Sequence, residues 1–383
     1  MSKKVKAKSG DDKSITVHAD RDLFGRLLIV ANVRQFNLQE VLSYELSPIP
    51  CALAHQDGSL RKTTKSHLVG IIKKLVNVVP QLHLQPENTV YILDGVAVVQ
   101  MTKSGHTSTF SELTMKYYSI FTSPLSTRKC NCVHVVFDQY FDTSIKAGER
   151  SRRGSSSALE VHIGGPSTPV PKQWDKYITN PKNKKNLCDF LTKSMCSLGK
   201  ARLPANPRLI IGGGLKDGER CVEITRANDY HELSDLQSNQ EEADTRMLLH
   251  AKHAASERQE VNIVIQSPDT DVLVLCAAHF NSIAPKELWF RTGLKDHLRF
   301  IPIHEVCQQL SGRILKSLPA FHALTGCDTT SALSGIGKKK PWKVLMRGPV
   351  HQESLGLLGQ QAEVDEETVK KCEAFVCDLY PSY

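Results

Sequence analysis

Seven acidic residues stand in this 383-residue sequence where their carboxylates could bind divalent cations. They are Asp94, Asp138, Glu242, Asp244, Asp269, Asp271 and Asp328. Asp269 and Asp271 lie two apart, and carboxylates so close raise each other's pKa unless a cation lies between them. Buried charge must be paired, protonated or bound to a metal. Mg²⁺ takes one or two carboxylates and keeps several waters, and a pair of ions needs a wider ring of acids, which these seven could supply.

Three short apolar runs indicate the strands that would position these acids: VYIL at 90–93, VHVVF at 133–137 and VNIVI at 261–265. They are apolar without alternation, which is typical of strands buried on both faces of a parallel sheet, and helical segments separate them. An aspartate follows each run, and ligands of such sheets bind beyond the carboxyl ends of the strands. A single aspartate there is more often a helix cap, but three together favour a binding site.

The segment SNQEEADTRMLLHAKHA at 238–254 predicts a helix that begins at Ser238, because Ser238 and Glu241 have the spacing of a capping box. Glu242 and Asp244 then lie in its first turns, where the helix dipole tolerates negative charge. Capping and solvation account for Glu241, but they leave Asp244 unexplained. This third acid in the segment therefore belongs to the predicted cation site.

Asp328 lies in HALTGCDTTSALSGIGKKKPWKVLM at 322–346, where Gly335-Ile336-Gly337 forms a turn between two helical segments. Three lysines, Lys338, Lys339 and Lys340, follow the turn. Glycines let backbone N–H groups approach a phosphate, and the lysines add positive charge. Considered alone, this segment fits a glycine-rich helix connection with exposed lysines equally well.

The formal net charge is +9, from 49 Lys and Arg residues against 40 Asp and Glu residues, and the excess is clustered. Residues 172–202 and 335–347 are two basic stretches, and the span 139–205 is basic and at first rich in Ser, Gly and Pro. Such clustering is what a phosphate-backbone partner requires, although a solvated basic face is as common for any single cluster.

Composition excludes several classes of protein. Hydrophobic residues make up 40% and charged residues 23%, so a sizeable core is expected and wholesale disorder is not. No apolar run approaches the length of a membrane span, and the polar start does not resemble a secretory signal. Eleven cysteines without a CxxC pair indicate reduced thiols. We therefore expect a nuclear or cytoplasmic protein with no membrane segment.

Taken in order, the acidic segments resemble motifs of the flap endonuclease/XPG family of structure-specific nucleases, whose fold is PIN-like. VYILDG and VHVVFDQ are similar to the family's first two metal-binding strands, EEADTR to its E-A-E segment and SPDTDVL to its D-x-D segment. LTGCDTTSALSGIGKKK is similar to the G-C-D-Y and G-I-G motifs of its helix–two-turn–helix. The resemblance covers about 94–347, and its specificity comes from the shared order of the motifs.

The resemblance implies an α/β fold, with a PIN-like parallel-sheet nuclease core, and a metal-dependent structure-specific endo- or exonuclease acting on DNA or RNA. It implies two Mg²⁺ (or Mn²⁺) ions, the first held by Asp94, Asp138, Glu242 and Asp244 and the second by Asp269, Asp271 and Asp328. It also implies contacts to the scissile phosphate or displaced strand and to the duplex. The residues expected to make these contacts are Lys146, Arg150, Arg152, Arg153, Gly335, Gly337, Lys338, Lys339 and Lys340.

Composition, periodicity and the resemblance together predict the organisation of the chain. The expected parts are a disordered basic tail at 1–20, a helical N-terminal segment without evident chemistry at 21–85, the nuclease core at 86–350 and a helical tail at 351–383. Within the core, 139–205 is the arch-like basic insertion and 313–347 the helix–two-turn–helix. The sequence departs from the family at Gln139, Thr329 and Asp244, where Gly, Tyr and Glu are usual, and 93 residues precede Asp94.

Two other functions remain open. Asp269-Thr270-Asp271 after a strand is also similar to the motif of haloacid dehalogenase phosphatases, although that family places the pair at the strand end and early in the chain. A catalytically inert PIN-like protein that binds nucleic acid or serves as a scaffold is the second alternative. Retention of all seven acids favours catalysis.

Overall fold

The computed structural model describes residues 4–8, 14–18, 21–34, 37–43, 49–55, 57–141, 144, 160–226 and 230–380. Its centre is an eight-stranded sheet with the order β10-β9-β8-β3-β4-β5-β6-β7. The strands are β3 (Thr89–Asp94), β4 (Cys132–Val136), β5 (Arg208–Gly212), β6 (Cys221–Ile224), β7 (His231–Glu232), β8 (Asn262–Gln266), β9 (Glu287–Thr292) and β10 (Arg299–Pro302).

Five neighbouring strands, β9, β8, β3, β4 and β5, run parallel, and antiparallel strands extend the sheet at both edges. Every residue of β3 and β4 is buried, because helices cover both faces there. This accounts for the continuous apolar runs in the sequence. The topology confirms the predicted α/β class with a parallel core, and the three predicted strands coincide with β3, β4 and β8 within one residue at each end.

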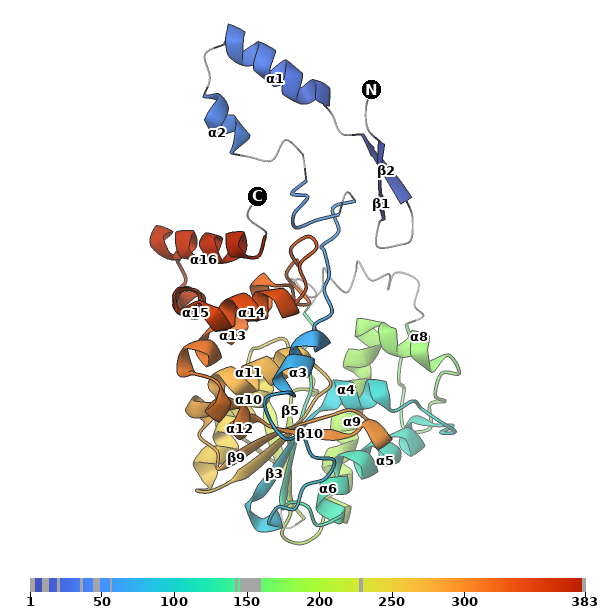
Figure 1. The fold of residues 1–383 in the computed structure, drawn as a ribbon. Coiled ribbons are helices and arrows are strands. Elements are labelled where there is room, and N and C mark those ends of the chain that lie inside the picture. Colours follow the sequence, from blue (N-terminus) through green and yellow to red (C-terminus); the bar gives the residue numbers. More distant parts are fainter. Residues whose placement is uncertain are drawn as a thin grey trace.

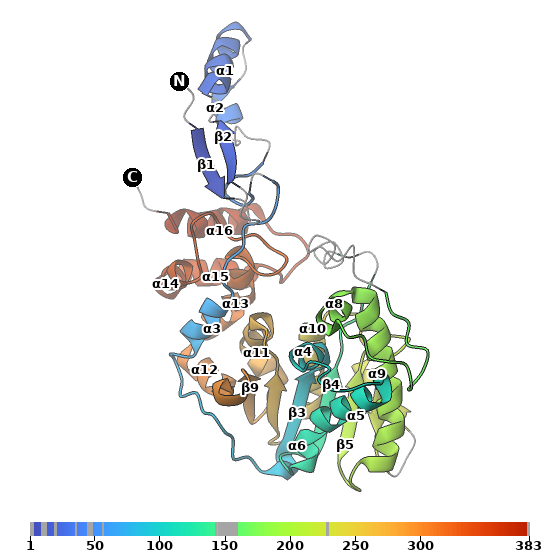
Figure 2. The same cartoon turned by 90° about the vertical axis from the view of Figure 1, so that its right-hand side faces the viewer.

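Helices pack on both faces of the sheet (Figures 1 and 2). One face is covered by α4 (Gly95–Met101), α5 (Phe110–Phe121), α6 (Ser123–Ser126), α8 (Trp174–Thr179) and α9 (Pro181–Arg202). The other face is covered by α3 (Ser66–Ile72), α10 (Ala243–Glu257), α11 (Thr270–Ile283), α12 (Ile303–Gln309) and α13 (Gly312–Leu324). Beyond α13 lie α14 (Lys339–Arg347), α15 (Pro349–Leu357) and α16 (Glu366–Asp378).

The strand order reverses at β3, which fixes where a ligand can bind. From β3 the chain proceeds to β4 and β5 on one side, whereas β8 and β9 lie on the other side. Connections that leave neighbouring strands in opposite directions open a crevice beyond their carboxyl ends. The ends of β3 and β8 are level, because Leu93 pairs with Gln266. This crevice is therefore bordered by Asp94 and, three residues after β8, by Asp269.

The N-terminal region differs from the expectation. Residues 4–8 and 14–18, which were expected in a disordered tail, form an antiparallel pair, β1 (Lys4–Lys8) and β2 (Ser14–His18). Both strands alternate polar and apolar residues, the period of a strand. Helices α1 (Arg21–Val33) and α2 (Leu38–Leu42) follow and lie away from the sheet, as Figures 1 and 2 show. In contrast, α3 buries Leu68 and Ile72 fully in the main core.

Two other regions contribute more buried residues to the core than their sequence patterns indicated. Helix α9 lies within the expected arch-like insertion, yet its apolar residues Leu187, Leu191 and Met195 are fully buried against the sheet. It is the crossover helix between β4 and β5. The segment at 351–383 is helical as predicted, and Leu355 and Phe375 bury in the same core as α13. Among the described residues, no helix has the length and apolarity needed to cross a membrane.

Candidate metal centre

The predicted acids converge at the carboxyl edge of the parallel strands. Asp94 ends β3, Asp138 follows β4 by two residues, and Asp269 precedes α11. Asp94 is 9% exposed, and its Oδ1 accepts from the backbone N–H of Ala97 at 2.8 Å. The hydroxyl of Ser267, at the end of the neighbouring strand, donates to Asp94 Oδ2 at 3.2 Å. Burial, and next the charge of Asp138, raise the pKa of Asp94 to about 7.

Asp138 places the acidic helix α10 beside the strand ends. Its Oδ1 accepts from the backbone N–H of Ala243, the first residue of α10, at 2.8 Å. The helix therefore begins at Ala243, and the predicted start at Ser238 is wrong. The reason is tertiary: Gln139 binds the segment before the helix, its N–H donating to Glu241 O at 2.7 Å and its side chain to Ser238 O at 2.7 Å. These contacts hold Ser238 and Glu241, the predicted capping box, in a non-helical conformation.

Asp244, in the first turn of α10, has four other acids among the groups that perturb its carboxyl. Burial first, and then the charges of Asp269, Glu242, Asp138 and Asp94, together raise the pKa of its carboxyl to about 9. Such a carboxyl is held protonated at neutral pH unless a cation joins it. Oxygens of Asp244, Asp269 and Asp271 lie within 4.8 Å of one another. This carboxylate set fits a hard divalent cation such as Mg²⁺ or Mn²⁺.

The other side of the cluster contains a cation that the sequence did not indicate. The ammonium of Lys65 lies 3.0 Å from Asp269 Oδ1, 2.9 Å from Asp271 Oδ1 and 2.9 Å from Asp328 Oδ1. Burial works to lower the pKa of Lys65, but the carboxylates outweigh it and hold the pKa above its ordinary value. The N-terminal segment, which was expected to lack chemistry, therefore contributes directly to the site. No spacing motif links Lys65 to acids more than 200 residues away.

His322, on α13, is a second contact that sequence analysis missed. Its Nε2 lies 2.9 Å from Asp271 Oδ1, and the ring is 6% exposed. Burial by itself would raise the pKa of Asp271, but the hydrogen bond from His322 and the contacts of Lys65 hold it well below its usual range. The acidic cluster therefore has two halves: Asp94 and Asp244 have raised pKa values, whereas Asp271, beside Lys65 and His322, has a lowered pKa.

Lys338 does not have the surface position that a contact to a phosphate backbone requires. Its side chain is fully buried, and its ammonium donates to His322 O at 2.7 Å and to Thr325 Oγ1 at 2.8 Å. Burial lowers its pKa to about 8. Lys338 thus binds the end of α13 and supports His322, whereas its neighbours Lys339 and Lys340 are exposed.

The remaining predicted nucleic-acid contacts fall into two groups. Gly335 and Gly337 are exposed, Gly335 has a φ of +73°, and a side chain at Gly335 would meet no atom within 4 Å. The backbone of this turn is therefore open to a large partner. The other expected contacts lie outside the described residues; they are Lys146, Arg150, Arg152 and Arg153.

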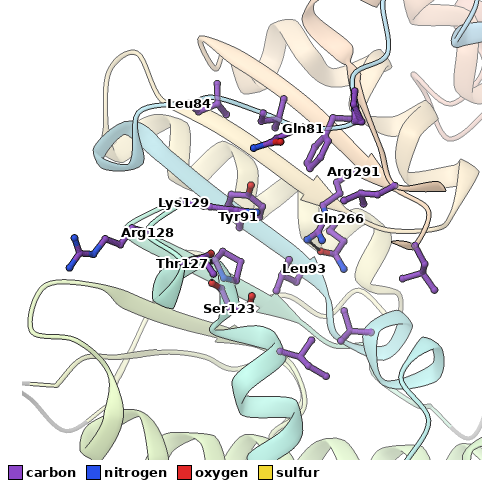
Figure 3. Close-up of a pocket in the computed structure, with 18 of the residues that line it drawn as sticks. Gln81, Leu84, Tyr91, Leu93, Ser123, Thr127, Arg128, Lys129, Gln266 and Arg291 are labelled. Carbon is purple, nitrogen blue, oxygen red and sulfur yellow. Dashed lines mark hydrogen bonds between the residues drawn. The ribbon is translucent and has the colours of Figure 1, made fainter. Parts of the chain in front are cut away.

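A hollow of about 230 Å³ adjoins Asp138 and contains two lysines that could face a phosphate, Lys185 on α9 and Lys216 in the β5–β6 turn. A larger hollow of about 890 Å³ lies under residues 80–84, and Figure 3 shows Tyr91, Gln266 and Arg291 lining it from three neighbouring strands. Arg291 donates there to Gln266. None of the seven acids lines this larger hollow, so the acid chemistry is confined to the strand ends.

Solved structures with similar folds include a flap endonuclease and the catalytic core of Rad2. The flap endonuclease of bacteriophage T5, in a product complex with DNA and metal ions, matches with 11% identity and a TM-score of 0.38, over 76% of this chain and 87% of that one. The catalytic core of Rad2 in complex with DNA substrate matches with 12% identity and a TM-score of 0.39, over 82% of this chain and 80% of that one. No protein-family model and no curated protein matches the sequence.

Proposed function

We propose that this chain is a metal-dependent, structure-specific nuclease that hydrolyses phosphodiester bonds of nucleic acid, with DNA as the expected substrate. The supporting observation is the convergence of acids from separate elements at one crevice. Asp94 and Asp138 follow β3 and β4, Glu242 and Asp244 begin α10, and the others are Asp269, Asp271 and Asp328. The causes of the pKa shifts show that these carboxylates act on one another. A fold gains no stability from such mutual repulsion, so a cation-dependent function is the simpler explanation.

The chemistry that suits this arrangement is attack of water on a phosphodiester. A divalent cation bound among these carboxylates would supply the charge that activates a water and stabilises the leaving oxygen. The chain's own residues supply the frame. Ser267 and the N–H of Ala97 orient Asp94, and Asp138 fixes the start of α10 and with it Asp244. Asp94 and Asp244 are therefore positioned by a buried strand and a helix start, whereas Asp328 lies in the connection between α13 and α14.

Basic groups around the crevice support nucleic acid as the partner. Lys185 and Lys216 flank the hollow beside Asp138, and Lys339 and Lys340 are exposed next to the open turn at Gly335. Lysines of this kind neutralise backbone phosphates without distinguishing base sequence. Recognition by the shape of the nucleic acid is what this arrangement favours.

The geometry also bears on the phosphatase alternative. In that chemistry the first aspartate of the pair is the nucleophile, yet Asp269 Oδ1 accepts from both the ammonium of Lys65 and the N–H of Asp271. These bonds engage it as the cap of α11 and lower its nucleophilicity. We therefore favour the nuclease, and an inert binding protein stays as the outcome that an activity assay can distinguish.

Cleavage of labelled single-stranded, duplex and 5′-flap DNA by the purified chain tests the proposal, with Mg²⁺, Mn²⁺ or EDTA. We expect metal-dependent cutting, and a loss of about a thousandfold or more in Asp244→Asn, because the affected charge acts in the transition state. Asp378→Asn, which changes an exposed carboxylate in α16, is the matched control and should cut normally. A folded wild type that shifts these DNAs without cutting them would support the inert binding protein, and release of inorganic phosphate from a small phosphoester would support the phosphatase.

A further inference from the structure

Arg291, on β9, is a charged residue on the sheet face that packs against α4, α5 and α9. Its neighbours on this face include Tyr91, Leu93 and Phe300, which are all buried. The guanidinium of Arg291 donates to the side-chain oxygen of Gln266 and lies 5.9 Å from the centre of the Phe300 ring. Among the described residues, its buried Nε has no hydrogen-bond partner and no carboxylate forms an ion pair with it. The described residues therefore give Arg291 no anionic partner, which a partly buried charge requires.

The sheet fixes the position of this guanidinium. In the strand register, Arg291 stands opposite Gln266 of β8 and Phe300 of β10. The N–H of Ser267 donates to Arg291 O at 3.3 Å, which joins this part of β9 to the end of β8. The location of the charge is therefore a consequence of strand pairing and does not depend on a flexible loop.

The larger hollow, of about 890 Å³, lies in front of Arg291. Ligand pockets usually measure about 300–1,000 Å³, so the hollow has room for a small organic molecule. Residues 80–84 cover it, and a backbone bridge between Val79 and Phe300 anchors this segment to β10. The hollow is thus enclosed by the sheet on one side and by a bound segment of the chain on the other.

The polar lining of this hollow is one-sided in charge. Figure 3 shows Ser123 and Thr127 extending from α6 and the turn after it, and Gln266 and Arg291 extending from the sheet. Lys129 also lines the hollow, and none of the described residues that line it is acidic. Such a lining favours a ligand that brings negative charge, because hydrogen bonds between ionised groups are the strong ones.

The chemistry of these groups narrows the class of anion. A guanidinium binds two oxygens of a phosphate or carboxylate at once. Burial raises the pKa of Tyr91 to about 12, so its phenol stays neutral and does not serve as the counter-ion. With Lys129 as a second cation, a phosphate monoester of almost two negative charges suits the hollow better than a singly charged carboxylate. The apolar walls, which include Leu93 and Val98, would cover an apolar or aromatic body.

We propose that this hollow is a binding site for a phosphate monoester with an aromatic or other apolar body, its phosphate held by Arg291 and Lys129. The site is separate from the acidic cluster and does not rest on the proposed nuclease function. It shares two strands with that cluster, because Leu93 and Gln266 immediately precede Asp94 and Ser267.

Calorimetry of the full-length chain in EDTA tests the proposal with adenosine 5′-monophosphate and phenyl phosphate. Inorganic phosphate, adenosine and phenol supply the head and the bodies separately, and EDTA prevents binding through a metal at the acids. We expect micromolar binding of at least one monoester, and at least about tenfold weaker binding of the separate parts and of the monoester to Arg291→Gln. Arg347→Gln, at an exposed arginine in α14, is the matched control and should bind as the wild type does.

Absence of binding of both monoesters to the wild type would overturn the inference, and so would unchanged binding to a folded Arg291→Gln. Inorganic phosphate that binds as tightly as the monoesters would also overturn it, because the site would then be one for an adventitious ion only. If Arg291→Gln does not fold, hydrogen exchange of the wild type locates the ligand. Protection of residues 80–84 and 123–129 would support the site, whereas protection confined to the surroundings of Lys185, beside Asp138, would overturn it. The proposed nuclease is tested separately by cleavage and stands or fails independently.

Discussion

The two halves of the acidic cluster consist of the same residue type but differ in how their charge is balanced. Asp94 and Asp244 have pKa values raised to about 7 and about 9, chiefly by burial and then by neighbouring acids. Asp271 has a pKa held well below its usual range by His322 and Lys65, although burial opposes them. The difference teaches that a carboxylate cluster is not one functional unit. Lys65 and His322 stabilise the charged form of Asp271, whereas burial and neighbouring acids favour the protonated form of Asp94 and Asp244.

The origin of the two halves in the chain explains this difference. Asp94 and Asp244, whose pKa values are raised, come from the end of β3 and the start of α10, and Asp94 accepts hydrogen bonds from the N–H of Ala97 and the hydroxyl of Ser267. The neutralised half faces α3 and α13, which bring Lys65 and His322. The helical N-terminal segment thus completes the site instead of preceding it.

The same substitution should have opposite effects on stability in the two halves. Without metal at pH 7, we expect Asp244→Asn to raise Tm, because it removes a carboxyl that is costly to ionise. Asp271→Asn should lower Tm by at least as much, because Lys65 and His322 lose an anionic partner. Each change should be about 1–3 kcal/mol, or a few degrees at about 2–4 °C per kcal/mol. Thermal melts in EDTA measure both, with Asp378→Asn as the control; shifts of the same sign would contradict the comparison.

A smaller effect concerns pH. Because Asp244 has a folded pKa of about 9 against an ordinary value of 3.8, the folded chain holds a proton that the unfolded chain has released, and stability falls as pH rises between these values. Below about pH 6.5, buried His134 and His250, whose pKa values are lowered, oppose this trend. Above about pH 8, Lys338 opposes it too.

Between pH 6.5 and 8 we therefore expect the metal-free protein to lose about 1–2 kcal/mol of unfolding free energy per pH unit. Asp271 should add no slope there, because its lowered pKa places its stabilising window below pH 4. Urea unfolding in EDTA at several pH values measures the slope. Asp244→Asn should remove most of the slope and leave only the part that Asp94, with its pKa of about 7, contributes at the lower end of the window. Added Mg²⁺ should flatten the slope, and an unchanged slope in the variant would assign it to other groups.

The smallest expected effect distinguishes the buried Lys338 from its exposed neighbours Lys339 and Lys340. Lys338→Met should lower Tm by a few degrees, because it leaves buried acceptors at His322 and Thr325 unpaired, and should leave DNA affinity nearly unchanged. The double variant Lys339→Met and Lys340→Met should leave Tm unchanged and reduce the salt dependence of DNA binding by about two units of slope. Melts and salt titrations of binding check both, and a loss of DNA affinity in Lys338→Met alone would reverse the assignment.

Much of the strand framework was predictable because burial on both faces leaves a clear apolar pattern. Runs at 90–93, 133–137 and 261–265 became β3, β4 and β8, and the acids after them lie at the strand ends as expected. Other elements were ambiguous. The apolar run at 272–278 has the length of a strand but lies in α11, which begins where Asp269 accepts from the N–H of Asp271. Short apolar runs do not distinguish a buried helix from a buried strand.

Local pattern also failed where a distant residue competes for the backbone. The capping box at Ser238 satisfies every local rule for a helix start, yet α10 begins at Ala243. Gln139 binds the carbonyl groups of this segment, and Asp138 supplies the cap from another strand. Tertiary hydrogen bonds of this kind leave no periodicity in the sequence.

The order and type of the residues were enough to indicate an α/β chain with carboxylates at the ends of parallel strands, since strand burial and strand-end position are both local consequences of the pattern. Which carboxylates are neutralised was decided only by the tertiary structure. Lys65 and Asp269 are more than 200 residues apart, and their contact depends on α3 packing into the core beside α11. Electrostatic balance depends on distance in space, and a linear sequence does not state that distance.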